Sequence, residues 1–132
     1  MDKKVKLADA EWKIMLQLWK DSPLSCRQLE DRLKEETGWT RHVIISFLKR
    51  MIVKETIRME DASPVKLYYP ILNRDEVVLE ETRTFITKLF DGSLGLMTSF
   101  LVENNDITEE EINTMMDILH KARSKDGEDG VV

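Results

Sequence analysis

Apolar residues recur at helical spacing in three successive segments of the N-terminal half of the chain. Within each segment they stand about three, four and seven positions apart, so they share one face of a helix and leave the other face polar. The predicted buried stripes are Trp12, Met15, Leu16 and Trp19 in the first segment, Cys26, Leu29 and Leu33 in the second, and Ile44, Phe47, Leu48 and Met51 in the third. The pattern predicts three short amphipathic helices.

Capping residues mark the ends of these helices. Asp9 is the expected N-cap of the first helix. Ser25 and Gln28 form a capping box, in which each side chain can bond to the backbone N–H of the other residue. Gly38 can adopt the left-handed conformation that ends the second helix, and the third helix opens at Thr40.

A β-hairpin is expected after the third helix. Residues 57–60 and 65–69 are rich in β-prone side chains, and Asp61-Ala62-Ser63-Pro64 between them is typical of a turn. Three small helices followed by a hairpin is the order of elements in a winged helix-turn-helix. We therefore expect a fold that is mainly α with a small β-hairpin, in which residues 1–72 form the winged-helix domain.

Three more helices are predicted in residues 73–121. The first begins at a capping box, Asn73 to Glu76, and is broken by Asp91-Gly92. The second runs from Leu94 to about Glu103, and the third begins at a further capping box. Residues 122–132 are charged and contain glycine, so we expect a disordered tail there.

The three helices predicted in residues 73–121, here called the arm, form a segment that is too small to bury its own apolar stripes. The economical solution is a homodimer, in which the same helices of two copies cover one another, so that residues 73–121 form a dimerisation domain. The alternative is that the arm folds back on residues 1–72. The residues expected to hold the dimer together are Phe85, Leu89, Phe90, Leu94, Met97, Phe100, Leu101, Met115, Met116 and Leu119.

Charge divides the chain at the same place. The net charge is −5, but residues 1–72 hold 14 Lys and Arg against 11 Asp and Glu, a net charge of +3. Residues 73–132 hold 6 against 14, a net charge of −8. Such asymmetry suggests a mildly basic contact module joined to an acidic partner module.

The composition also indicates the cellular compartment of the protein. No apolar run approaches the roughly 18 residues that span a bilayer, and the N-terminus leads into no signal-peptide core. The single cysteine, Cys26, excludes an internal disulfide framework and fits a reducing compartment. We expect a cytoplasmic protein without direct membrane insertion, in which Cys26 is a small helix filler.

Catalytic and metal-binding motifs are missing from the sequence. It contains no H-E-x-x-H, no G-x-S-x-G and no glycine-rich phosphate loop, and His42 and His120 lie in separate modules. The run Glu109-Glu110-Glu111 does not share one helix face, and it favours a helix N-terminus through the helix dipole instead. We expect no enzymatic activity, no metal and no cofactor.

The outer face of the third helix carries candidate DNA-binding side chains. His42, Ser46 and Lys49 lie opposite the apolar stripe, with Arg50 on the flank. A helix of this size fits the major groove of DNA, where such side chains can donate to base edges and phosphates. The alternative is a solvated surface helix, which is the commoner case for such a pattern taken alone.

Four segments of the chain carry a distinctive combination of residues. They are A-E-W-K-I-M-L-Q-L-W at Ala10–Trp19, W-T-R-H-V-I-I-S-F-L-K-R at Trp39–Arg50, Y-Y-P at Tyr68–Pro70 and F-D-G-S-L-G at Phe90–Gly95. In this order, over about residues 5–121, the chain resembles the BlaI/MecI penicillinase and methicillin-resistance repressors. The resemblance implies a homodimeric winged-helix repressor of double-stranded operator DNA. It also implies release by cleavage between Ser99 and Phe100, after activation of a membrane-bound β-lactam sensor-protease.

The resemblance also implies a set of DNA contacts, with some departures. In the family, polar or basic residues that face the operator are common where this chain has Val43 and Ile45, Lys is usual at Val53, and Gly is usual at Glu55. The tip of the predicted wing is acidic, so its contribution would come from Lys66 and Arg58. The residues expected to contact DNA are Thr40, Arg41, His42, Val43, Ile45, Ser46, Lys49, Arg50 and Lys66.

Two functions remain open at this point. The first is a dimeric transcriptional repressor. The second is a winged-helix adaptor that has lost operator binding and contacts proteins instead, for which the apolar residues Val43, Ile45 and Val53 and the acidic wing are the support. Binding to duplex DNA at moderate salt separates the two.

Overall fold

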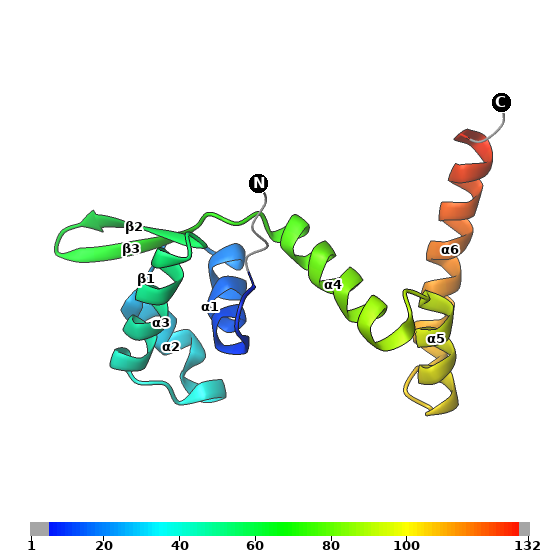
Figure 1. Cartoon of the computed structure of the whole chain (residues 1–132), viewed down its shortest axis with the longest axis horizontal. Helices are drawn as coiled ribbons and strands as arrows, with labels where there is room; N and C mark the ends of the chain where they lie inside the picture. The colour runs from blue at the N-terminus through cyan, green and yellow to red at the C-terminus, as the bar shows by residue number, and fades with distance from the viewer. Residues whose placement is uncertain (1–5, 130–132) are drawn as a thin grey trace. The chain divides into compact units, whose positions relative to one another are not determined.

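The computed structural model describes residues 6–129, with side chains up to residue 125 (Figure 1). The chain divides into two compact units, Met1–Leu79 and Glu80–Val132. The division falls inside α4 (Arg74–Phe90), whereas the sequence analysis places the boundary after residue 72. Val77 packs against the core of the first unit, so the start of α4 belongs with the winged helix.

The first unit is a winged helix, as predicted. Its elements are α1 (Asp9–Lys20), β1 (Leu24–Ser25), α2 (Cys26–Thr37), α3 (Arg41–Val53), β2 (Ile57–Ala62) and β3 (Val65–Pro70). The strands form an antiparallel sheet in the order β1-β3-β2. In Figure 1 the β2–β3 hairpin lies above the three helices.

The hairpin is longer than predicted, and one strand was not predicted. Strand β2 extends to Ala62, two residues further than predicted, while β3 begins at Val65 as predicted and continues to Pro70. Only Ser63-Pro64 forms the turn, and the Oδ1 atom of Asp61 closes it by accepting a hydrogen bond from the N–H of Ser63 at 3.1 Å. Strand β1 pairs Leu24 with Tyr68. With two residues it is too short to carry an alternating pattern.

The buried face of helix α1 agrees only in part with the predicted one: Met15 is buried, but the face is turned away from Leu16. Leu16 belongs to the predicted stripe, but it is 47% exposed. The buried residues are Glu11, Ile14, Met15 and Leu18. Both faces have helical spacing, and the sequence favours the face without a carboxylate because a charged residue is rarely buried.

Trp12 and Trp19 are half-buried at the edge of the core. Their rings meet edge to face, with centroids 5.9 Å apart. The Nε1–H of Trp19 donates a hydrogen bond to the carbonyl oxygen of Leu72 at 2.9 Å. This bond satisfies the polar atom of the indole and ties α1 to the segment that precedes α4.

Glu11 is fully buried and joins the start of α1 to the end of α3. Its Oε1 atom accepts hydrogen bonds from the backbone N–H of Ala8 and from Nζ of Lys54, each at 2.8 Å. Because Glu11 reaches back to this N–H, Ala8 is the N-cap, and the prediction of Asp9 as the cap is wrong. The Oε2 atom of Glu11 has no hydrogen-bond partner among the described residues.

The predicted caps of α2 and α3 are confirmed. The N–H of Gln28 donates to Ser25 Oγ at 3.2 Å, and the N–H of Ser25 donates to Gln28 Oε1 at 2.9 Å. The N–H of Val43 donates to the hydroxyl oxygen of Thr40 at 3.4 Å. These local bonds fix where α2 and α3 begin.

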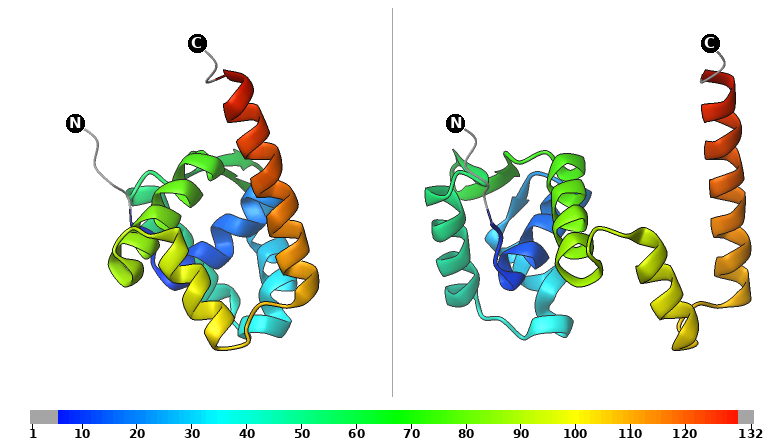
Figure 2. Two further views of the ribbon diagram at one scale, coloured as in Figure 1. Left: turned by 90° about the vertical axis from the view of Figure 1, so that its right-hand side faces the viewer. Right: turned by 45° about the vertical axis from the view of Figure 1, so that its right-hand side comes forward.

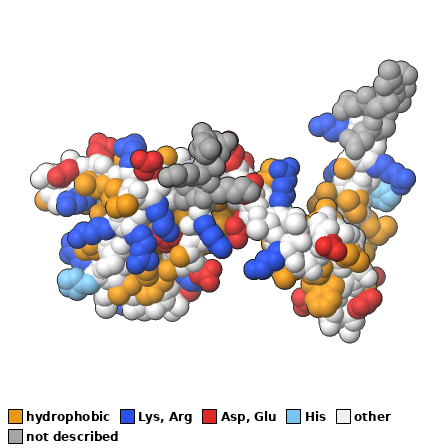
Figure 3. Space-filling view, viewed as in Figure 1, with side chains coloured by type: hydrophobic (Ala, Val, Ile, Leu, Met, Phe, Trp, Pro, Cys, Tyr) orange, Lys and Arg blue, Asp and Glu red, His pale blue; other side chains and the backbone are white. Residues whose placement is uncertain are grey.

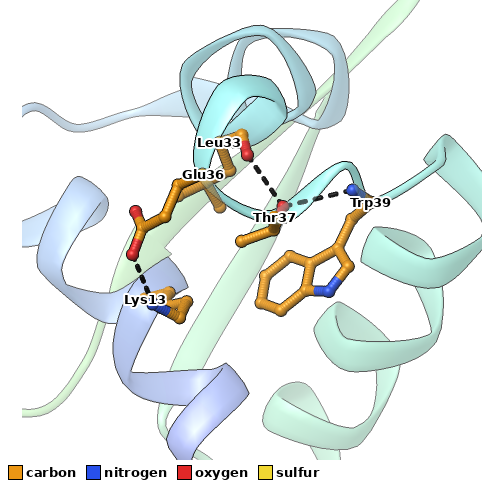
Figure 4. Close-up of polar contacts among 5 residues, drawn as sticks. All are labelled: Lys13, Leu33, Glu36, Thr37 and Trp39. Atoms are coloured by element: carbon orange, nitrogen blue, oxygen red, sulfur yellow. Dashed lines mark hydrogen bonds and ion pairs between the residues drawn. The ribbon is translucent and has the colours of Figure 1, made fainter.

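The turn between α2 and α3 is held by the Thr37 side chain (Figure 4). Its hydroxyl donates to the carbonyl oxygen of Leu33 at 2.7 Å and accepts from the N–H of Trp39 at 3.1 Å. Gly38 between them has a φ of +67°, the left-handed conformation that was predicted. The turn thereby directs the chain into α3.

Helix α3 ends in a Schellman motif that places Glu55 in the left-handed region. The N–H of Thr56 donates to Met51 O and the N–H of Glu55 donates to Ile52 O, both at 3.0 Å. Glu55 has a φ of +63°. This is the position at which the family resemblance leads one to expect glycine, and a side chain there is strained.

The second unit contains the rest of α4, α5 (Leu94–Glu103) and α6 (Glu109–Asp129). The predicted break between α4 and α5 is confirmed, with Asp91 and Gly92 both at positive φ. Figure 2 shows α6 as one long helix, where the sequence predicts disorder from residue 122. Ala122 and the basic residues near it are good helix formers, which continues α6 to Asp129; residues 130–132 lie outside the described range.

The described side chains of the second unit leave many apolar groups in solvent. Ile86 is the buried residue among the described side chains of this unit. The exposed large apolar residues are Phe85, Leu89, Leu94, Leu96, Phe100, Val102, Ile112, Met116, Ile118 and Leu119. Within residues 6–129 no single helix is long and apolar enough to cross a membrane, although α4 and α5 together, as a bent pair, meet the requirement by length and composition.

Replacing Lys54 by alanine is expected to destabilise the winged helix by about 2 kcal/mol, because the buried Glu11 carboxylate loses its cation. The cost is below that for a fully buried pair, since the Lys54 side chain is 35% exposed. Chemical denaturation followed by tryptophan fluorescence measures the loss, because Trp12, Trp19 and Trp39 all lie in the first unit. Lys13→Ala is the control: it removes the ion pair to Glu36 on the surface and should cost less than about 1 kcal/mol. Equal losses would contradict the role assigned to Glu11.

Replacing Glu55 by glycine is expected to stabilise the first unit by about 1 kcal/mol, because glycine adopts positive φ without a steric penalty. The same denaturation experiment measures the gain. Glu35→Gly, in the right-handed helix α2, should instead lower stability by about 1 kcal/mol. A loss of stability in both variants would rule out strain at Glu55.

Candidate nucleic-acid interface

Helix α3 presents an exposed polar face on the side away from the core. Ile44, Leu48 and Met51 are buried as predicted, whereas Phe47 is half-buried and packs on Trp39 with ring centroids 4.9 Å apart. The exposed polar residues are Arg41, His42, Ser46, Lys49 and Arg50. This helix is therefore held firmly by one face while the other remains available to a ligand.

A groove of about 600 Å³ lies between α3 and the β2–β3 hairpin. Its lining is Arg41, Ile45, Lys49 and Ile52 from α3, Met59, Pro64, Val65, Lys66 and Tyr68 from the hairpin, and Ser25, Cys26 and Arg27 from the start of α2. We call this feature the basic groove, because its charged residues are four cations and no carboxylate.

The cations of the basic groove form no ion pair within the described part of the chain. The ion pairs found there use other basic residues, namely Lys13, Arg32, Lys54, Arg58 and Arg74. Figure 3 shows Lys and Arg side chains gathered over the visible face of the first unit. An uncompensated set of cations around a groove attracts an anion.

Burial controls the two weak acids that line the groove. It raises the pKa of the Cys26 thiol; Arg41 lowers that pKa and Glu30 raises it, each by less than the effect of burial. Burial also raises the pKa of the Tyr68 phenol, with a further rise from Cys26 and an opposing effect of Arg41. Both groups are therefore neutral near neutral pH, and the cations alone set the charge of the groove.

Comparison with known proteins places the chain in a family. Residues 7–121 match the penicillinase repressor family. The chain belongs to this family. The penicillinase repressor of Bacillus licheniformis is 27% identical over 96% of this chain and 100% of its own length. The methicillin resistance regulatory protein MecI of Staphylococcus aureus (strain N315) is 23% identical over 92% of this chain and 99% of its own length.

A solved structure agrees with this assignment. The solution structure of the DNA binding domain of the repressor BlaI matches with a TM-score of 0.51 and 25% sequence identity, covering 58% of this chain and 93% of that chain. The resemblance drawn from the four sequence segments is thus confirmed. The chain spans nearly the full length of both repressors named above.

The residues predicted to contact DNA fall into two groups in this family member. Arg41, Ile45, Lys49 and Lys66 line the basic groove. Thr40, His42, Val43, Ser46 and Arg50 lie outside its lining, and Arg50 stacks on Phe47 with its guanidinium 5.9 Å from the ring centroid. Both groups lie on α3 except for Lys66, which is on β3, and Thr40, which is the N-cap of α3.

Two further basic residues lie near these groups. Arg58 lies on the wing as expected, where its guanidinium is 3.9 Å from the Tyr69 ring centroid and 3.6 Å from Glu60. Arg27 was missed by the sequence analysis, although it lines the basic groove. Its signal is a cation in the first turn of α2, where the helix dipole favours an anion.

The second unit of this repressor family member contains a cleft of about 760 Å³ around the predicted cleavage position. It is lined by Lys88, Leu89, Phe90, Asp91, Leu96, Ser99, Phe100 and Glu103. The centroid of the Phe90 ring lies 6.2 Å from that of Phe85 and 5.9 Å from that of Phe100. The remaining predicted dimer residues Met97, Leu101 and Met115 are half-buried.

Proposed function

We propose that the protein is a homodimeric transcriptional repressor that binds double-stranded operator DNA and regulates β-lactam resistance genes. The observation that carries the proposal is the uncompensated set of cations on α3 and along the basic groove of a winged helix. The names of its relatives support the proposed class of regulated genes, since these relatives are called penicillinase repressor and methicillin resistance regulatory protein. Neither unit is assigned a catalytic role.

In this proposal α3 lies in the major groove of the operator. His42 and Ser46 are exposed and short enough to reach base edges, while Arg41, Lys49 and Arg50 reach phosphates. Val43 is exposed to 37% and can contact a thymine methyl group. The departures from the family at Val43 and Ile45 would then change the preferred operator sequence rather than abolish binding.

The second unit is the proposed dimerisation domain. Helix α5 buries no residue completely, and exposed apolar side chains follow one another along α4, α5 and α6. A second copy can cover these side chains, since a two-fold interface uses the same patch on both subunits. Two winged helices on one duplex face would contact half-sites about one helical turn, roughly 34 Å, apart.

Cleavage between Ser99 and Phe100 is the proposed means of release, carried out after a membrane-bound β-lactam sensor-protease is activated. Both residues are exposed and line the cleft of the second unit. The cut would separate Phe100, Leu101 and all of α6 from the rest of the chain. Much of the apolar surface available for dimerisation would leave with them.

A protein-interaction adaptor is the second candidate, favoured by Val53. This residue is 82% exposed on α3, where an apolar side chain suits a protein partner better than a phosphate. The basic groove favours nucleic acid over this alternative. Absence of any salt-dependent binding to duplex DNA would favour the adaptor.

Two substitutions on α3 should separate base reading from phosphate binding. Lys49→Ala is expected to weaken binding to all duplex sequences and to reduce the salt slope by about one unit, because a phosphate contact is lost. Ser46→Ala should instead relax the preference at one base position and leave the salt slope unchanged. Selection of preferred sites from a random pool, followed by fluorescence-anisotropy titration, measures both effects. An equal loss of affinity for all duplex sequences in Ser46→Ala would contradict base reading by Ser46.

A chain that ends at Ser99 should be monomeric and should bind its selected operator about 10²-fold more weakly, because two linked modules lose their effective-concentration advantage. Sedimentation equilibrium and gel-shift titration give the two values. The control chain ends at Lys121, so it keeps Phe100 and most of α6 and should remain dimeric. Operator binding by the shorter chain as tight as by the intact chain would refute release by cleavage.

A further inference from the structure

The basic groove receives one of its cations from neither α3 nor the hairpin. Arg27 belongs to the first turn of α2 and is exposed. The dipole of α2 disfavours a cation at this end of the helix, and no described ion pair involves Arg27. By contrast Arg32, later in the same helix, pairs with Asp21 at 2.8 Å. Arg27 therefore forms no ion pair with another described residue, and its place in the groove directs it toward an external anion.

The position of the groove indicates which anion this is. In duplex DNA one sugar–phosphate strand separates the major groove from the neighbouring minor groove. If α3 lies in the major groove and the β2–β3 hairpin reaches toward the adjoining minor groove, the intervening strand must pass along the space between α3 and the hairpin. That space is the basic groove.

The lining of the groove has the mixed chemistry that such a strand requires. Arg27, Arg41, Lys49 and Lys66 can neutralise phosphates. The apolar residues of the lining can contact the carbon atoms of deoxyribose; they are Ile45, Ile52, Met59 and Val65. The replacement of a polar residue by Ile45, a departure from the family, suits this second part of the strand.

We propose that the basic groove holds one sugar–phosphate strand of the bound duplex, and that Arg27 is a phosphate-binding residue. This inference rests on the proposed function, and it adds to α3 a second contact element, the start of α2. Phosphate contacts position the protein without reading sequence, so Arg27 contributes equally to every duplex. Base reading remains with the outer face of α3.

The test measures the salt dependence of binding to a short random-sequence duplex by the full chain. Arg27→Ala should bind several-fold more weakly, and the slope of log K against log salt should shrink by about 0.9, the value for one phosphate contact. Arg32→Ala is the matched control, because it removes the same charge from the same helix outside the groove. Arg27→Lys should restore most of the slope, and Arg27→Gln repeats the loss with a side chain closer in size. Thermal melting of each variant verifies the fold.

The results distinguish failure of the role of Arg27 from failure of the repressor function. An unchanged slope in folded Arg27→Ala and Arg27→Gln, or an equal loss in Arg32→Ala, overturns the role of Arg27 while the repressor function stands. Failure of the unaltered chain to bind any duplex with salt dependence overturns both. On the selected operator, where the protein binds in one register, replacement of single phosphates by neutral methylphosphonates adds a direct check: one position should weaken the unaltered chain and leave Arg27→Ala unaffected.

Discussion

A small buried polar cluster at the end of α3 fixes the geometry of the winged helix. The Glu11 carboxylate holds the N–H of Ala8 and the ammonium group of Lys54, so the start of α1 is fastened to the end of α3. Two residues after Lys54, Thr56 is fully buried. Its carbonyl oxygen accepts hydrogen bonds from the N–H groups of Ile71 and Leu72 at 2.9 and 3.3 Å. The chain that leaves the hairpin therefore returns to the point where α3 ended. One cluster sets the direction of α3, the base of the wing and the segment leading into α4.

This cluster favours a specific geometry more than it favours stability. Burying a carboxylate costs several kcal/mol unless it is well paired, and one oxygen of Glu11 lacks a partner among the described residues. Glu55 adds backbone strain at the adjacent turn. The apolar core must offset both. The basic residues are divided accordingly: Lys54 serves this buried cluster, whereas the cations of the basic groove form no ion pair within the described part of the chain and remain available to a ligand.

Features set by neighbouring residues could be predicted from the sequence, and features set by distant contacts could not. The Ser25–Gln28 box, Gly38 and the Thr40 cap were correctly predicted because each acts within one turn of chain. The buried face of α1 was not, since Glu11 can be buried only because Lys54 reaches it from the end of α3. The same reason applies to the candidate site. The exposed residues of α3 follow from helical periodicity, but Arg27 joins them only after the sheet has brought β3 beside the start of α2.

The ten residues of α5 must be both covered for the proposed dimer and accessible for the proposed cleavage. A helix of this length is marginal in water by itself, so its order depends on burial against neighbours. No α5 side chain is fully buried within the chain, and the dimer is the proposed source of the missing burial. A peptide bond inside a helix must become extended before a protease can cut it, and the cost of that local opening rises as the helix is covered. The surface that would join the subunits would therefore also protect the Ser99–Phe100 bond, so release by cleavage requires an interface stable enough to hold the operator and weak enough to open α5 to the protease.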